Sequence, residues 1–241
     1  MKRDAFGILA AHYGAEQIVR TLEPFVSGRR RARIEAVLGA RLKSVGVAIE
    51  APYDPHNAAA VVRSAEALGA WSVDVIAANE RVLRARRTTT GTHNWIATRN
   101  HRDLEAFLSA VGPARAAGMR LVGACVDATH MLEELPVDRP LCLLFGNEHA
   151  GLSAAAQSAC DLRFRIPIHG FAESYNLSVS AALSLYSVGT RRRALLGRSG
   201  DLDTDEMTVE RARCYYRSVA VRHVAAAFPD PGLGAAGTKT E

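Results

Sequence analysis

Three segments of the sequence combine glycines with polar side chains of the kinds that bind anions or move protons. Each follows a short apolar run, and each leads into a stretch of helical character. They are residues 53–69 with Asn57 and Arg63, residues 146–153 with Glu148, and residues 166–178 with Ser174 and Asn176. Ligands of open α/β sheets bind beyond the carboxyl ends of the strands, so we expect the three segments to share one site.

Arg63 is the side chain in these segments best suited to bind a phosphate or to stabilise a developing oxyanion. Its guanidinium can donate two parallel hydrogen bonds to one anion. However, Arg63 lies among Ala, Val and Leu residues, where a long cationic side chain can simply extend into solvent. Taken alone, Arg63 is explained more simply by solvent exposure than by chemistry.

The other two segments have the features of ligand-binding loops. Gly146 and Gly151 permit sharp turns and a close approach of the backbone to a ligand, and Glu148 between them could pair with a cation or position a substrate. A helix that starts near Asn176 offers unpaired N–H groups to a bound group. The alternatives are an ordinary loop before a capped helix and a plain N-cap at Ser174 or Asn176.

Alternating apolar and helical stretches must position these segments. We predict strands at residues 45–50, 72–77, 120–126, 141–145 and 162–166, and helices at residues 29–41, 58–68, 102–118, 153–159 and 176–196. Asn57 is the predicted N-cap of the helix at 58–68. This alternation predicts an α/β fold with a mostly parallel sheet and helices on both faces.

The ends of the chain differ in composition from its middle. We predict a helical N-terminal extension over residues 1–43, the α/β domain over residues 44–196, and a basic helical extension over residues 197–228. One helix is expected over residues 206–228. Residues 229–241 are rich in Gly, Pro and Ala, and we expect them to form a disordered tail.

The charge of the chain favours an anionic partner without requiring one. The 241 residues have a formal net charge of +5. The arginines cluster at positions 29, 30, 31, 33 and 41, at 81, 84, 86 and 87, at 191–193, and at 211, 213, 217 and 222. These clusters suit phosphate binding, and solvated helix faces explain them equally well.

The cysteines and the apolar runs place the protein in a reducing, aqueous compartment. The four cysteines form no Cys-x-x-Cys pair, and no segment approaches the roughly 18 apolar residues of a membrane span. We therefore expect a cytoplasmic protein without a disulfide framework, a zinc site or a membrane partner.

Taken together and in this order, the three segments resemble the signature motifs of the SpoU (TrmH) branch of the SPOUT methyltransferases. Asn57 with Arg63 resembles motif 1, residues 146–151 resemble motif 2, and residues 166–178 resemble motif 3. One such motif is weak evidence, whereas three in order across about half of the chain are specific.

The resemblance implies that S-adenosylmethionine donates a methyl group to a ribose 2′-hydroxyl of RNA; it assigns no metal-binding residue and leaves the metal dependence of the reaction open. It implies a SPOUT-type fold whose C-terminal trefoil knot, over roughly residues 141–187, binds the cofactor. The implied cofactor-binding residues are Ala124, Leu144, Gly146, Ile166, Ile168, Tyr175 and Leu177. The family usually has leucine at the position of Tyr175, so cofactor contacts there are expected to differ.

The resemblance also implies a catalytic set composed of Arg63, Asn57, Glu148, Ser174 and Asn176. A ribose hydroxyl is a poor nucleophile while it is protonated, and in the family the equivalent of Arg63 is implicated as the base. A guanidinium normally keeps its proton. Either dense positive charge permits transient deprotonation, or Arg63 orients the phosphate and stabilises the alkoxide.

The flanking segments resemble the subgroup that modifies guanosine 18 of tRNA. The implied RNA-binding residues are Arg30, Arg33, Arg41 and Arg217. Family members are homodimers, so Arg63 is expected to complete the partner's pocket. The apolar face of residues 181–195 is a candidate dimer contact, and ordinary core packing explains it equally well. Two alternatives remain: an rRNA methyltransferase, against which the short N-terminal extension argues, and a non-catalytic RNA-binding protein.

Overall fold

The structure, a computed structural model, describes residues 5–78 and 91–229. The arginine cluster at positions 81–87 and nearly all of the predicted disordered tail lie outside the described residues. The described residues form two units, one within residues 40–201 and one that combines the two ends, within residues 5–39 and 202–229. The two units are described separately.

The unit of residues 40–201 contains a sheet in which seven strands run parallel in the described residues, in the order β3-β2-β1-β6-β4-β7-β5. The strands are β1 (Val45–Glu50), β2 (Ser72–Ile76), β3 (Ala97–His101), β4 (Arg120–Ala124), β5 (His130–Met131), β6 (Leu141–Phe145) and β7 (Leu162–Arg165). The prediction of a parallel sheet is confirmed, and so are its five predicted strands.

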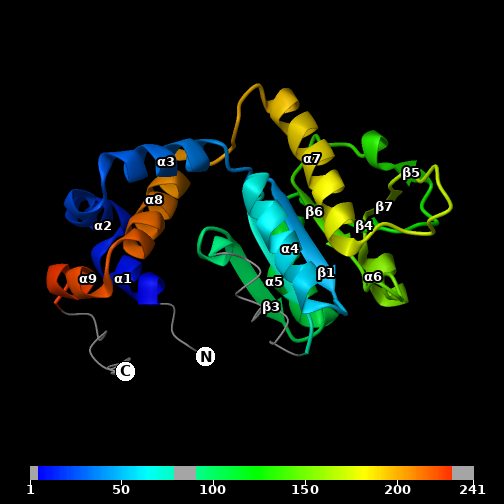
Figure 1. The fold of residues 1–241 in the computed structure, drawn as a ribbon, viewed down its shortest axis with the longest axis horizontal. Coiled ribbons are helices and arrows are strands. Elements are labelled where there is room, and N and C mark those ends of the chain that lie inside the picture. Colours follow the sequence, from blue (N-terminus) through cyan, green and yellow to red (C-terminus); the bar gives the residue numbers. More distant parts are fainter. Residues whose placement is uncertain (1–4, 79–90, 230–241) are drawn as a thin grey trace. The chain divides into compact units, whose positions relative to one another are not determined.

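Helices cover both faces of this sheet (Figure 1). On one face, α4 (Pro55–Ala67) and α7 (Leu177–Leu196) pack against each other and against the sheet. On the other face, α5 (Leu104–Ala116) and α6 (Ala154–Ala159) cover a second core. Alternate residues of each central strand enter opposite cores because successive side chains of a strand point to opposite faces.

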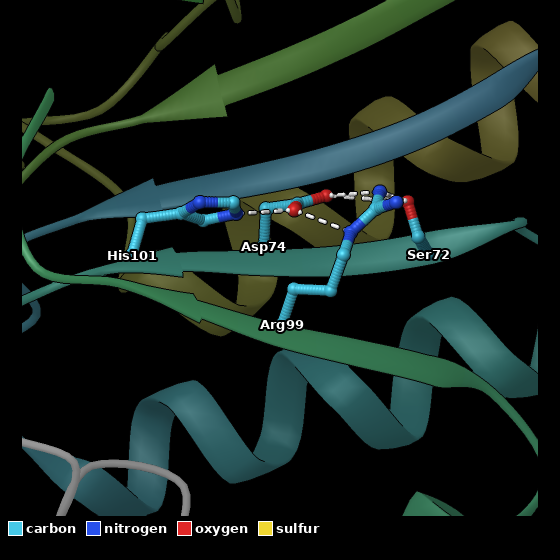
Figure 2. Close-up of polar contacts among 4 residues, drawn as sticks. All are labelled: Ser72, Asp74, Arg99 and His101. Carbon is cyan, nitrogen blue, oxygen red and sulfur yellow. Dashed lines mark hydrogen bonds and ion pairs between the residues drawn. The ribbon is translucent and has the colours of Figure 1, made fainter. Parts of the chain in front are cut away.

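Strand β3 was not predicted because its residues, Ala-Thr-Arg-Asn-His, are mostly polar. A polar network with β2 explains how such a strand joins the sheet (Figure 2). The carboxylate of Asp74, 1% exposed, accepts hydrogen bonds from Arg99 Nε and Nη2 at 2.8 and 2.9 Å, and lies 2.7 Å from His101 Nε2. The hydroxyl of Ser72 donates to Asp74 at 3.2 Å. The buried carboxylate is thus fully partnered, as burial of a charge requires.

Helix α4 begins three residues earlier than predicted, and this corrects the position of Asn57. Asp54 is the N-cap and accepts a hydrogen bond from the backbone N–H of His56, while Pro55 occupies the first turn. Proline suits that position because its fixed φ is helical and it needs no N–H partner there. Asn57 therefore lies inside the first turn of α4, and its side chain remains available for other contacts.

The arginine cluster at positions 191–193 stabilises the α/β unit instead of presenting free charge. Arg191 donates to the carbonyl oxygens of Leu132, Glu133 and Leu135. Arg193 donates to the carbonyl oxygens of Ala40 and Leu68 at 3.0 and 2.9 Å, the second of which lies at the C-terminus of α4. Partial burial lowers the pKa of both guanidinium groups.

Arg41, one of the predicted RNA-binding residues, is buried and hydrogen-bonded within the α/β unit. It is 4% exposed, and its Nη1 donates to the carbonyl oxygen of Ala70 at 2.9 Å. Its Nη2 donates to the carbonyl oxygen of Trp95 and lies 3.7 Å from the carboxylate of Glu66. A guanidinium held in this way cannot reach a phosphate without losing these buried bonds.

The unit formed by the chain ends is helical. It contains α1 (Ala5–Tyr13), α2 (Ala15–Leu22), α3 (Gly28–Gly39), α8 (Thr204–Ser218) and α9 (Val221–Ala227), which share one apolar core. The helix predicted over residues 206–228 is in fact two helices, because Val219 and Ala220 are extended. This break lets Val219 and Val224 both enter the core.

Candidate active site

A cavity of about 730 Å³ opens at the carboxyl ends of the neighbouring strands β6, β4 and β7. The loops that follow these three strands line it, together with the start of α7. Six of the seven predicted cofactor-binding residues are among its lining residues, namely Ala124, Gly146, Ile166, Ile168, Tyr175 and Leu177. Leu144 is the exception, because its side chain is fully buried in the core beneath α5 and α6.

Glu148 joins the first two chemical segments beside this cavity. One carboxylate oxygen accepts a hydrogen bond from Asn57 Nδ2 at 2.9 Å, and the other accepts one from the backbone N–H of Tyr53 at 2.8 Å. The backbone N–H of Asp54 also donates to the Glu148 carboxylate, with its nitrogen 3.3 Å from Oε1. Partial burial alone would raise the pKa of Glu148, but these hydrogen bonds outweigh it and hold the pKa below its ordinary value. Glu148 is therefore an anionic acceptor that organises two loops.

Asn57 links this pair to the third segment. Its Oδ1 accepts a hydrogen bond from Asn176 Nδ2 at 3.1 Å. Asn176 is the N-cap of α7, because its Oδ1 accepts hydrogen bonds from the backbone N–H and the hydroxyl of Ser178, at 2.8 and 2.7 Å. The three motifs therefore meet in one chain of hydrogen bonds, Glu148–Asn57–Asn176.

Sheet topology explains why segments almost a hundred residues apart meet here. Strands β1 and β6 are parallel neighbours, so the loops that follow them leave the sheet side by side. Asn147 fastens them together by donating to the carbonyl oxygen of Ala51 at 2.7 Å. Ala51 has a φ of 45°, the one positive φ among the described non-glycine residues. A strained backbone of this kind is found most often where a site must be held in place.

The third loop is closed by Tyr175, the residue that departs from the family pattern. Its hydroxyl donates a hydrogen bond to the carbonyl oxygen of Pro167 at 3.1 Å, which joins the two ends of the loop. Both residues line the cavity. The tyrosine hydroxyl thus has a structural partner that a leucine would lack. Ser174, another predicted catalytic residue, also lines the cavity.

Arg63 is not brought to this network. It is exposed on α4, it does not line the cavity, and it makes no hydrogen bond or ion pair with the other described residues. It lies six residues beyond Asn57, which places the two side chains on different sides of the helix. Within one subunit, the predicted catalytic set is therefore divided into an assembled group and a separate arginine.

Several residues of the site were not singled out by sequence reasoning. Glu50 accepts hydrogen bonds from the N–H and hydroxyl of Ser153, at 2.8 and 2.7 Å, and so holds the end of the second loop. Tyr53 and His149 contact each other beside the cavity. A charged residue at the end of an otherwise apolar strand, as at Glu50, was the one available signal.

The remaining predicted RNA-binding residues lie in the helical unit. Arg33 and Arg217 are exposed, and Arg30 is half-buried with its Nε donating to the hydroxyl of Ser218 at 3.3 Å. Other arginines of this unit are paired internally. Arg211 forms a two-point hydrogen-bonded pair with Glu35, which lowers the pKa of that carboxyl.

Comparisons with known proteins agree with this geometry. The SpoU rRNA Methylase family matches residues 44–186. A protein of Borreliella burgdorferi named tRNA (guanosine(18)-2′-O)-methyltransferase is 31% identical over 176 residues, which cover 73% of this chain and 79% of the relative. The solved structure of the A. aeolicus TrmH/SpoU tRNA modifying enzyme has a TM-score of 0.70 at 24% identity, over 83% of this chain and 98% of its own.

A second solved structure bears on the cofactor. The SpoU methyltransferase AviRb of Streptomyces viridochromogenes, in complex with AdoMet, has a TM-score of 0.59 at 31% identity, covering 65% of this chain and 64% of its own. The motif residues, the parallel sheet and the family match over more than half of the sequence lead to one conclusion: this chain belongs to the SpoU methylase family.

Proposed function

We propose that this protein is an S-adenosylmethionine-dependent 2′-O-methyltransferase of tRNA that acts on guanosine 18. The observation that carries the proposal is the chain of hydrogen bonds Glu148–Asn57–Asn176 beside the cavity. The name of the Borreliella burgdorferi relative supports tRNA as the substrate. Action on tRNA agrees with a cytoplasmic location, and no helix of the described residues is long and apolar enough to cross a membrane.

The lining of the cavity fits S-adenosylmethionine. Ile166, Ile168 and Leu177 provide apolar side chains for the adenosine, and Glu173 and Ser174 provide polar groups for the charged amino-acid part. When bound, the cofactor supplies an electrophilic methyl group. The side chains around it exclude water and hold the loops that follow β6 and β7 in place.

Asn57, Glu148 and Asn176 position the ribose, and Arg63 acts on it from another subunit. A cation that takes part in catalysis must reach the reacting oxygen. Arg63 is exposed and does not line the cavity of its own subunit, which supports its action in the cavity of another subunit. A homodimer is supported further by α7, which leaves Val179, Leu183 and Tyr186 exposed on the side away from the core. In such a dimer, the Arg63 guanidinium would orient the phosphate and stabilise negative charge on the 2′-oxygen, and the hydroxyl proton would pass to water.

The two chain ends and the fold of the C-terminal segment complete the proposal. Arg33, Arg217 and half-buried Arg30 contact the phosphates of the tRNA. The extensions at residues 1–43 and 197–228 thus serve RNA binding, while residues 44–196 carry catalysis. We extend the proposal to a trefoil knot over residues 141–187, which rests on the membership of the chain in the SpoU methylase family.

The test is incubation of purified protein with labelled S-adenosylmethionine and total tRNA, followed by nucleoside analysis. We expect 2′-O-methylguanosine from tRNA. Label in rRNA alone would refute tRNA as the substrate, and no label in any RNA would refute the assignment as an enzyme.

The Arg63→Ala variant separates catalysis from binding. Methyl transfer should fall by roughly 100-fold or more, while the Kd for S-adenosylmethionine stays unchanged, because Arg63 does not line the cavity of its own subunit. Arg102→Ala is a matched control, since Arg102 is also an exposed arginine and pairs with the adjacent Asp103. Mixing inactive Arg63→Ala with inactive Asn57→Ala subunits should restore activity if Arg63 acts across the dimer.

A further inference from the structure

Tyr53 and His149 form an exposed aromatic corner beside the cavity. Their ring centroids are 4.8 Å apart and their planes meet at 79°. Tyr53 is 71% exposed, and His149 is exposed and lines the cavity. A perpendicular contact uses the edge of one ring, so each ring keeps at least one face that the other does not cover.

Hydrogen bonds from the second loop fix the backbone beneath this corner. The N–H of Tyr53 is fixed by Glu148, and the residue two before it, Ala51, has the positive φ described above. The N–H of His149 donates to Asn147 Oδ1 at 2.9 Å, and Asn147 also holds the carbonyl oxygen of Ala51. Two exposed rings are therefore presented by backbone that three hydrogen bonds keep in place.

An enzyme that modifies a ribose must also accommodate the base attached to it. A nucleotide whose ribose enters a cavity has to leave its stack in the folded RNA, and its base then needs a new surface. Proteins that bind unstacked RNA bases most often supply an aromatic face for this purpose. Glu148 bonds both to the backbone of Tyr53 and to Asn57, so the Tyr53 ring lies next to the side chains that we propose to position the ribose.

We propose that the Tyr53–His149 corner is a binding site for the base of the nucleotide that is methylated, with the base stacked on the Tyr53 ring. This inference rests on the proposed function, because it requires an RNA nucleotide in the cavity. Phe171 and Tyr175 are also exposed aromatic side chains near this opening. Phe171 makes no ring contact with the described residues, the hydroxyl of Tyr175 is bonded to the carbonyl oxygen of Pro167, and Tyr53 alone of the three is paired with His149, which lines the cavity. The site is therefore assigned to Tyr53.

The test is a double-mutant cycle between the enzyme and its substrate. Tyr53→Ala and the unchanged protein are each assayed on a tRNA and on the same tRNA with an abasic ribose at the methylated position. On the intact tRNA, kcat/KM should fall roughly 5- to 150-fold, as expected for the loss of one base–aromatic stack. On the abasic tRNA the same substitution should change kcat/KM less than about 2-fold, because the partner is already absent.

Two further variants make the result specific. Tyr53→Phe should keep activity on the intact tRNA within about 3-fold, because stacking needs the ring and not the hydroxyl. Phe171→Ala serves as the matched exposed aromatic and should show no coupling to the base. The Kd for S-adenosylmethionine and the unfolding midpoint should be the same in all variants.

The outcomes distinguish this site from the proposed function. Equal losses on intact and abasic tRNA, with the unchanged protein active, would overturn the base site and leave the methyltransferase assignment standing. Coupling at Phe171 in place of Tyr53 would also overturn it. If the unchanged protein methylates no RNA at all, both proposals fail together.

Discussion

Replacing Gly146 with alanine should disrupt the loop that follows β6, because its backbone passes too close to that of Gly151. A Cβ at position 146 would lie 2.1 Å from the carbonyl carbon of Gly151 and 2.2 Å from the backbone nitrogen of Leu152. Both are backbone atoms, so no side chain can turn away to make room. The loop is also tied across its neck, where Asn147 and Gly151 exchange two backbone hydrogen bonds at 3.0 and 2.8 Å.

The cost can be worked out from these contacts. Overpacking a well-packed site costs about 1–3 kcal/mol, and each hydrogen bond lost as the neck opens adds about 1 kcal/mol. We therefore expect Gly146→Ala to lose at least about 3 kcal/mol, divided between stability and ligand affinity. If the loop opens and relieves the strain, the Kd for S-adenosylmethionine should rise about 100-fold.

Urea unfolding and calorimetric titration with S-adenosylmethionine measure the two parts. Two other glycines calibrate the result. At Gly151, where φ is 68° and a Cβ meets no atom within 4 Å, alanine should cost about 1–2 kcal/mol for its left-handed backbone. At Gly170, where a Cβ also meets no atom, alanine should change stability by less than about 0.5 kcal/mol. A Gly146→Ala protein as stable and as tight in binding as Gly170→Ala would refute the reasoning.

Four further expectations follow from other contacts. Asp74→Asn should destabilise the protein by about 3 kcal/mol in urea unfolding, the low end for a broken buried ion pair because half-exposed Arg99 can rehydrate. A loss below about 1 kcal/mol would contradict the role of this network. Because hydrogen bonds hold the pKa of Glu148 low, its contribution to stability should be complete above about pH 4.5 and be lost as the pH falls through its lower folded-state pKa. Glu148→Gln should remove this part of the acid dependence of unfolding, and an unchanged profile would count against it. Tyr175→Phe removes one loop-closing hydrogen bond, so affinity for S-adenosylmethionine should fall by up to about 10-fold, measured by titration. Burial raises the pKa of the Cys160 thiol to about 12, so iodoacetamide at neutral pH should label it much more slowly in the folded than in the urea-unfolded protein; equal rates, followed by mass spectrometry, would disprove this.

Local sequence was sufficient for most of the α/β unit. The continuous apolar run at β6 predicts a strand buried on both faces, and Ser153 and Asn176 are recognisable N-caps of α6 and α7. Local sequence did not predict the elements that depend on contacts with a neighbouring strand. Strand β3 has no apolar pattern, and it joins the sheet because Asp74 of the neighbouring strand pairs with Arg99 and His101.

Neighbouring residues also misled at the ends of helices. Asn57 is a good N-cap by type, but Asp54 and Pro55 begin the helix first and leave Asn57 for the Glu148 network. The helix predicted over residues 206–228 breaks at Val219, because burying Val219 and Val224 in one core needs a turn between α8 and α9. Neither the start of α4 at Asp54 nor the break after α8 can be predicted from residue types alone.

The sequence by itself determined which residue types are present for the reaction and the order in which they occur. Three motifs around Asn57, Glu148 and Asn176 identify the family, because their residue types, order and spacing can be read from the sequence without the fold. Tertiary structure alone decided how they are used. Parallel pairing of β1 with β6 brings Asn57 to Glu148, whereas the turn of α4 directs Arg63 away from them. Burial, which depends on long-range packing, likewise made Arg41 a structural residue although its type and position resemble those of its exposed neighbours.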